Sequence, residues 1–173
     1  TSKNITNYVK IQSIVESHDI RSLARSSPKF SKQDLKRVNA DILKNLSFDL
    51  ANEKLSKLGI KKINADFWDL IKNNIEFINE ANEWLDIIYS NKIFLKVNNA
   101  FINECADVLP EAPFTINTWD HWLERISKIS NKKGKELYTP LRLALTGKES
   151  GPKLKFLLPL LSRKIVLNRL GKS

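Results

Sequence analysis

The segment YTPLRLALTGKESGPKLKFLLPLL, residues 138–161, constrains the fold most strongly, because it is an apolar helical pattern interrupted in its middle. Leucine and alanine recur at helical spacing before Gly147, and a new apolar run follows Gly151 and Pro152. Glycine ends helices readily and proline is tolerated only at their start, so the segment predicts a helix, a short polar loop and another helix. The basic residues expected around this break are Arg142, Lys148 and Lys153.

The remaining chain shows the same helical spacing of apolar residues and no convincing strand alternation, which predicts an all-α fold. Ser31, with Asp34 three residues later, is typical of a helix start, and Gly59 is typical of a helix end. Besides the two halves of the broken segment, helices are expected over 6–17, from Ser31 onward, over 48–58, from a cap at Asn64, over 75–89, over 97–108, from a cap at Thr118, and from Ser162 to Gly171.

The chain length of 173 residues suits one domain or two small ones, and 42% hydrophobic residues suffice for a core. We expect a connector over 1–30 and two packed helical subdomains over 31–96 and 97–173. A single cysteine, Cys105, excludes an internal disulfide, is expected to be buried, and fits a reducing cytoplasm. No apolar run is long enough to span a membrane. The absence of methionine predicts a piece of a longer protein.

The basic charge is concentrated at one end of the sequence. Residues 125–173 hold thirteen Lys and Arg residues against only Glu136 and Glu149, a net charge of +11, whereas the whole chain carries +10. One-sided positive charge beside a helix break favours a nucleic-acid partner. The alternative is a solvated protein face without a polyanionic ligand.

Signs of catalysis are weak. His18 and His121 are far apart and have no Cys or His neighbours at metal-ligand spacing, and no phosphate-binding loop, dinucleotide turn or nucleophile elbow is present. No metal or cofactor is expected in this chain. The tryptophans fall on apolar helical faces, which favours core packing, although indole rings also stack on unpaired bases. They are Trp68, Trp84, Trp119 and Trp122.

Arg142 is the sharpest single candidate for a ligand contact, because it lies among Leu and Ala residues at the edge of a helix face. It has two interpretations. The guanidinium either hydrogen-bonds carbonyls at a helix end, or it meets a base edge or a phosphate with paired hydrogen bonds. The Gly151-Pro152 pair supports the latter, because glycine permits close approach of the backbone to a ligand.

The segment GKELYTPLRLALTGKESGPKLKFLLPLLSRKIVLNRL closely resembles the C-terminal end of bacterial glutamyl-tRNA synthetases. The shared motifs are Gly134-Lys135, Pro140-Leu141-Arg142, Ala144 to Gly147, Gly151-Pro152 and Leu157 to Leu161. Residues 24–30, ARSSPKF, resemble a second family motif. The family usually has an aspartate directly after these residues, where this chain has Ser31. The stretch ANEWLDIIY resembles alpha-proteobacterial members, and the resemblance covers essentially the whole chain.

The resemblance implies a class I ligase that attaches glutamate to tRNA(Glu) with ATP and magnesium. The family's catalytic motifs are absent here, so this chain is expected to be the non-catalytic, monomeric, α-helical cage that binds the anticodon. Arg142 matches the family arginine that meets the first anticodon base, and Gly151, Pro152 and Leu154 match the segment enclosing that base. The further residues expected to bind the anticodon are Arg125, Thr146, Lys148 and Asn74.

The chain departs from the family pattern where some members use an arginine to read the third anticodon base. That position falls near Asn73 or Asn74, which lack a charged, two-pronged donor. We therefore hypothesise that the parent enzyme also charges tRNA(Gln). The alternatives to an anticodon-binding domain are a free-standing helical RNA-binding protein and a helical protein-interaction module.

Overall fold

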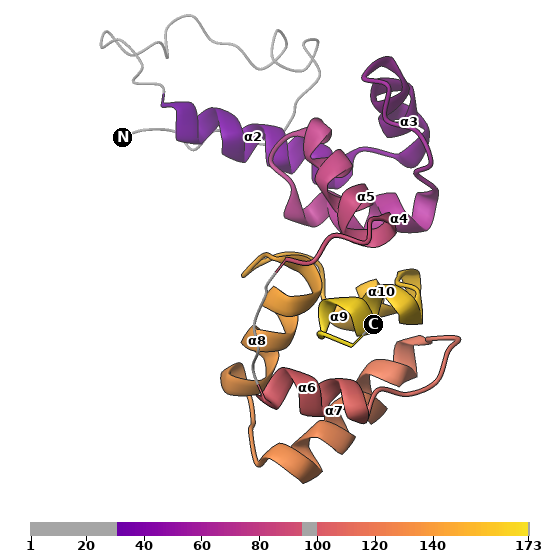
Figure 1. Ribbon diagram of the computed structural model, residues 1–173. Helices are drawn as coiled ribbons and strands as arrows, with labels where there is room; N and C mark the ends of the chain where they lie inside the picture. The colour runs from indigo at the N-terminus through magenta and orange to yellow at the C-terminus, as the bar shows by residue number, and fades with distance from the viewer. Residues whose placement is uncertain (1–30, 95–99, 173) are drawn as a thin grey trace, which may run out of the picture. The chain divides into compact units, whose positions relative to one another are not determined.

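The computed structural model describes residues 31–94 and 100–172, which contain helices and no strands (Figure 1). This confirms the predicted all-α class. Within these ranges, no helix has the length and apolar character that crossing a membrane requires. The α-helices are α2 (Lys32–Asn45), α3 (Phe48–Lys57), α4 (Ala65–Ile71), α5 (Ala81–Tyr89), α6 (Ala100–Asp107), α7 (Ile116–Ser130), α8 (Lys135–Thr146), α9 (Leu154–Leu157) and α10 (Arg163–Arg169). Short 3-10 helices are η2 (Lys72–Asn74), η3 (Ile78–Glu80) and η4 (Leu158–Leu160).

The chain divides into two compact units, of which the first ends at Glu80 and the second begins at Ala81. Helix α5 therefore belongs to the C-terminal unit. The boundary between the units lies earlier in the chain than the division near residue 96 that the sequence led us to expect. The functional subdomains 31–96 and 97–173 stay a prediction. The connector 1–30 and the helix expected over 6–17 lie outside the described residues.

The N-terminal unit is organised by helix caps that the sequence predicted. The Ser31 hydroxyl accepts the Asp34 N–H at 3.1 Å, and the Asp34 carboxylate accepts the Ser31 N–H at 3.2 Å. This reciprocal capping box satisfies two amides that the first turn of α2 would leave unpaired. The Asn64 side chain likewise caps α4 by accepting the Phe67 N–H at 2.9 Å, and Gly59 takes a positive φ of 75° after α3.

The helix predicted over 75–89 is wrong in its first part, because α5 begins only at Ala81. Ile75 is extended, and the Glu80 carboxylate accepts the N–H groups of Glu76 at 3.3 Å and Phe77 at 3.0 Å. These side-chain bonds give the backbone a partner outside a helix. Phe77 is 44% exposed, so the apolar spacing that suggested a helix here does not correspond to a buried face.

The predicted cap at Thr118 is also wrong, because α7 begins three residues earlier with Thr115 as its N-cap. Thr118 occupies the third helical position, where its hydroxyl accepts the Thr115 N–H at 2.8 Å. A capping box uses both of its residues for hydrogen bonds, and the sequence analysis assigned the cap to the wrong member of the pair.

In the C-terminal unit α7 packs against α9 and η4, α6 packs against α7 and α8, and α10 packs against α8. Trp122 is fully buried, and its indole N–H donates to the Cys105 carbonyl at 2.9 Å, which ties α7 to α6. Cys105 itself is buried, as expected. The core role predicted for the tryptophans is confirmed, because Trp68, Trp84, Trp119 and Trp122 are all at most 5% exposed.

Arg169 is the most deeply buried cation among the described residues of this unit, at 2% exposed. Its guanidinium donates to backbone carbonyls near the C-terminal ends of α5 and α8, and it lies 4.6 Å from the centre of the Phe94 ring. The acceptors are the carbonyls of Ile87, Ser90, Lys92 and Leu145. Helix C-terminal ends carry partial negative charge and unpaired carbonyls, so Arg169 joins three segments without a carboxylate partner among residues 31–94 and 100–172.

Candidate functional site

The broken apolar segment folds as the sequence predicted, with α8 ending at Thr146, a loop over 147–153 and α9 starting at Leu154. Gly147 follows α8 with a φ of 67°, and its N–H donates to the Leu143 carbonyl at 2.8 Å. This left-handed residue ends the helix and turns the chain away from its axis. The loop that follows is held over α5 by contacts of its own.

Gly151 is required where the loop meets α5. Its φ is 144°, and a Cβ built there would lie 2.4 Å from Cη2 of Trp84, which no side chain tolerates. Lys148 strengthens the same contact, because its ammonium pairs with the Glu83 carboxylate at 2.6 Å and lies 5.7 Å from the centre of the Trp84 ring. The loop is thereby seated on the N-terminal turn of α5.

A cavity of about 340 Å³ opens beside this loop, between α7, α8 and α9. Its walls combine aromatic rings, cations and one carboxylate, which suits a flat ligand that also carries hydrogen-bonding groups. The lining residues are Trp119, Asp120, Leu123, Tyr138, Arg142, Lys153, Leu154 and Lys155.

Arg142 supplies the polar group of this cavity that has a hydrogen-bond donor left without a partner among the described residues. Its Nη2 donates to the Pro152 carbonyl at 2.9 Å, while its Nη1 is buried and has no hydrogen-bond partner in the described structure. Burial lowers the pKa of Arg142, although a guanidinium stays protonated at neutral pH. A buried donor without an acceptor is costly, so Arg142 is held in a state that an incoming acceptor would stabilise.

The aromatic wall is formed by Trp119 and Tyr138, whose ring centres lie 6.3 Å apart with planes inclined at 33°. Tyr138 is 46% exposed, so part of its ring is free for stacking, whereas Trp119 is 5% exposed and supports it from behind. At the rim, the Lys155 ammonium pairs with the Asp120 carboxylate. Both partners are partly exposed, so this pair can exchange with a charged ligand at small cost.

The structure brings together four of the residues predicted from the sequence. Arg142 and Leu154 line the cavity, Pro152 provides the carbonyl that positions Arg142, and Gly151 lies beside it, with its built Cβ 3.6 Å from Arg142 Nη1. Thr146 is buried and does not line the cavity. Its hydroxyl donates to the Arg142 carbonyl at 2.7 Å, which makes it a support of the end of α8.

The other predicted residues lie elsewhere. Lys148 contacts α5 and is not among the lining residues, and Arg125 is exposed on α7. Asn74 belongs to the N-terminal unit, where its amide donates to the Leu70 carbonyl at 3.4 Å. No group of three or more His, Cys, Asp and Glu side chains in the described ranges could hold a metal ion.

Sequence reasoning missed Tyr138 and Asp120 as parts of this cavity. Tyr138 precedes Arg142 by four residues, so both lie on one helix face, and that spacing was a usable signal. Asp120 had no such signal, because it is one acid in an acidic turn of α7 until α9 brings Lys155 beside it.

A family model described as an anticodon binding domain matches residues 21–173. The chain belongs to this family. The Arg142 cavity and the whole C-terminal unit lie inside the matched range of this anticodon-binding domain.

Similar proteins name the enzyme family in which such a domain occurs. The domain is 34% identical over 172 residues to glutamate–tRNA ligase 1 of Rickettsia bellii, covering 98% of this chain and 39% of the ligase. It is 35% identical to glutamate–tRNA ligase 1 of Chelativorans sp. and 35% identical to glutamate–tRNA ligase 2 of Bartonella bacilliformis, covering 98% of this chain and 38% of each ligase. The chain thus spans about two fifths of these alpha-proteobacterial relatives.

The fold also matches a solved structure. A crystal structure of a glutamate tRNA ligase from Elizabethkingia meningosepticum in complex with its amino acid aligns with a TM-score of 0.67 at 13% identity, covering 94% of this chain and 36% of that one. This likeness concerns the fold. The resemblance seen in the sequence motifs is confirmed by the family match and by the relatives.

Proposed function

We propose that this anticodon-binding domain reads an unpaired tRNA base in the Arg142 cavity. The observation that carries the proposal is the buried, unpartnered Nη1 of Arg142, in a cavity that Tyr138 also lines. A guanidinium distinguishes bases through paired hydrogen bonds to acceptors on a base edge, and an aromatic ring stacks on any base. The cavity therefore combines Arg142, which would select the base, with Tyr138, which would stack on any base. Base readout requires both kinds of contact.

The base proposed to enter this cavity is the first anticodon base, and the resemblance of the surrounding motifs to the family supports this. Gly151 and Pro152 then lie beside Arg142 without lining the cavity, and Leu154 contributes an apolar wall. Thr146 supports the end of α8 below Arg142. Lys148 and Arg125 would act through charge, because neither lines the cavity, and both belong to the basic stretch that ends the chain.

The parent protein is proposed to be a cytoplasmic, monomeric glutamate–tRNA ligase that uses ATP and magnesium. The similarity of this chain to parts of several such ligases supports this. No residue of this domain is assigned to ATP, magnesium or the ligation step. Its contribution is to select the tRNA by its anticodon.

The tRNA accepted is proposed to be tRNA(Glu), with tRNA(Gln) as a second substrate. Asn74 supports the second substrate, because its amide makes only one long hydrogen bond, at 3.4 Å, and offers no charged fork to a base. Strong rejection of tRNA(Gln) by the full-length enzyme would refute this part.

The test compares binding of the chain to tRNA(Glu), tRNA(Gln) and an unrelated tRNA at two salt concentrations. Arg142→Met, which keeps the apolar stem, should weaken cognate binding by about 1–3 kcal/mol, or about 5- to 150-fold, and relax preference at one base. The control Arg37→Met removes an exposed arginine of α2 and should weaken all three tRNAs alike, if at all. Equal weak binding of wild-type chain to all three tRNAs would refute base reading.

A further inference from the structure

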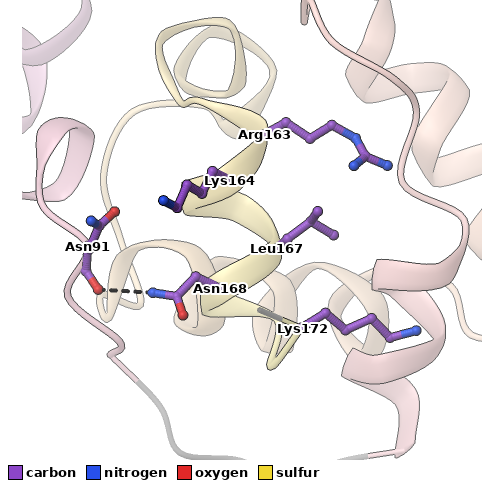
Figure 2. Close-up of a pocket in the computed structure, with 6 residues that line it drawn as sticks. All are labelled: Asn91, Arg163, Lys164, Leu167, Asn168 and Lys172. Atoms are coloured by element: carbon purple, nitrogen blue, oxygen red, sulfur yellow. Dashed lines mark hydrogen bonds between the residues drawn. The ribbon is translucent and has the colours of Figure 1, made fainter.

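Helix α10 borders another cavity, of about 480 Å³, which the base-reading function does not use (Figure 2). It shares no lining residue with the Arg142 cavity. We call it the α10 groove. Its lining residues are Asn91, Arg163, Lys164, Leu167, Asn168 and Lys172.

Among the residues that the structure describes, the α10 groove is lined by cations, amides and Leu167 and by no carboxylate. Lys164 is exposed and has no ion pair within residues 31–94 and 100–172. The side chains of Arg163 and Lys172 point to the opposite side of α10 from that of Lys164 (Figure 2). They pair with the carboxylates of Glu111 and Asp107. The groove is part of the basic stretch 125–173, whose charge the Arg142 cavity accounts for only in part.

The two ion pairs at the groove are easily exchanged. The Glu111 side chain is 83% exposed and the Asp107 side chain 60% exposed. Exposed pairs of this kind contribute about 0–1 kcal/mol to stability. A phosphate accepts charge-assisted hydrogen bonds from the same guanidinium and ammonium groups, so it can replace these carboxylates without a large loss.

The walls of the α10 groove are held in place by hydrogen bonds. The Asn168 amide donates to the Asn91 carbonyl at 3.1 Å, which joins α10 to the segment after α5 (Figure 2). The adjacent Arg169 donates to carbonyls of the same segment, including that of Lys92 at 3.2 Å. Leu167 leaves apolar surface between the cations. These bonds fix α10 against the segment after α5, so the backbone that carries the cations needs little ordering when a ligand binds.

We infer that the α10 groove binds phosphates of an RNA backbone, as a second contact with the RNA whose base enters the Arg142 cavity. The inference rests on the proposed function for the identity of the RNA. Separate lysine and arginine side chains suit a repeating phosphate chain, and such contacts position RNA without reading its sequence. The groove therefore adds affinity and orientation, and Arg142 adds selectivity.

The test measures how binding of an anticodon stem–loop RNA depends on salt. Each phosphate contact adds about 0.7–0.9 to the slope of log affinity against log salt, or about a threefold change in affinity between about 50 and about 200 mM. Lys164→Gln should lower the slope by one such step, and the combined Arg163→Gln, Lys164→Gln and Lys172→Gln variant by up to three. Preference among loop sequences should not change in either variant.

Lys133→Gln is the matched control, because it removes an exposed lysine of the same unit that lines neither cavity. An equal slope change in this control would assign the effect to net charge and overturn the inference. Circular dichroism checks that the combined variant is folded. If the combined variant is not folded, the slope of Lys164→Gln alone decides the test. If wild-type chain selects the cognate loop but Lys164→Gln keeps the full slope, the groove inference fails while the proposed function stands. If wild-type chain does not select any loop, the proposed function fails.

A tethered probe gives an independent measurement. Lys164→Cys introduces an exposed thiol in a chain whose own Cys105 is 0% exposed, with a thiol pKa raised by burial to about 12. An iron chelate attached at this position should cleave the bound RNA at the backbone positions that lie close to the groove. Absence of cleavage above that of free chelate would overturn the inference and leave the groove to a protein partner.

Discussion

Replacing Gly151 by alanine tests whether the loop over 147–153 is seated by close packing on Trp84. The added Cβ would lie 2.4 Å from Cη2 and 2.8 Å from Cζ2 of the Trp84 ring, which is 3% exposed and cannot swing into solvent. The φ of 144° adds backbone strain for any residue with a Cβ. We expect about 1–2 kcal/mol from strain and about 1–3 kcal/mol from overpacking, together about 2–5 kcal/mol of lost stability.

Gly134→Ala is the matched control. Gly134 also has a positive φ, of 54°, but a Cβ there meets nothing within 4 Å. This variant should lose only the strain contribution, about 1–2 kcal/mol. Urea unfolding followed by circular dichroism measures both losses.

A double-mutant cycle isolates the steric contribution. Trp84→Phe removes the ring atoms that the new Cβ would strike, so Gly151→Ala in that background should cost no more than Gly134→Ala. Gly151→Ala should also lower RNA selectivity, because it displaces the neighbouring Pro152 carbonyl from Arg142. If Gly151→Ala and Gly134→Ala destabilise equally in the wild-type background, the packing argument is refuted.

The remaining predictions concern buried groups. Arg142→Met should change the free energy of unfolding by less than about 1 kcal/mol, because the lost bond to Pro152 is offset by removing the unpartnered Nη1; a loss above about 3 kcal/mol in urea unfolding would show a structural role instead. Arg169→Met should cost at least about 3 kcal/mol in the same assay, because it leaves four backbone carbonyls without their donor, of which those of Ile87 and Leu145 are in buried hydrogen bonds, and a cost below about 1 kcal/mol would contradict this. Burial raises the pKa of Cys105 to about 12 from 9.0, so the unfolded chain releases the thiol proton first and stability should fall from pH 9 to pH 12; the Cys105→Ala variant, unfolded over the same range, should lack this part of the decline.

Much of the helical architecture follows from local sequence signals. Ser31 with Asp34, Asn64, Gly59 and Ser162 each mark a helix end that the structure contains, because caps act between residues three or four apart. The same locality explains the failures. Glu80 caps two amides and keeps 75–80 out of α5, and a local apolar count cannot detect that competition.

The candidate site divides in the same way. Tyr138 and Arg142 share a helix face, and Gly151 with Pro152 marks the loop, so these parts were within reach of the sequence. Asp120 and Trp84 were not, because each meets the site only through residues more than thirty positions away, Lys155 and Gly151 respectively. Burial also decided which tryptophans and cations are structural.

By itself, the sequence determined the all-α class, the helix–loop–helix around Arg142 and the family, since periodicity, caps and motifs are short-range properties of the chain. Only the tertiary structure decided that Arg142 keeps one buried nitrogen without a hydrogen-bond partner among the described residues. It also decided that Arg169, an equally basic residue, donates its hydrogen bonds to carbonyls near helix ends. The difference between the two arginines depends on which carbonyls long-range packing brings within hydrogen-bonding distance. The sequence shows the same side chain at both positions and so cannot distinguish them.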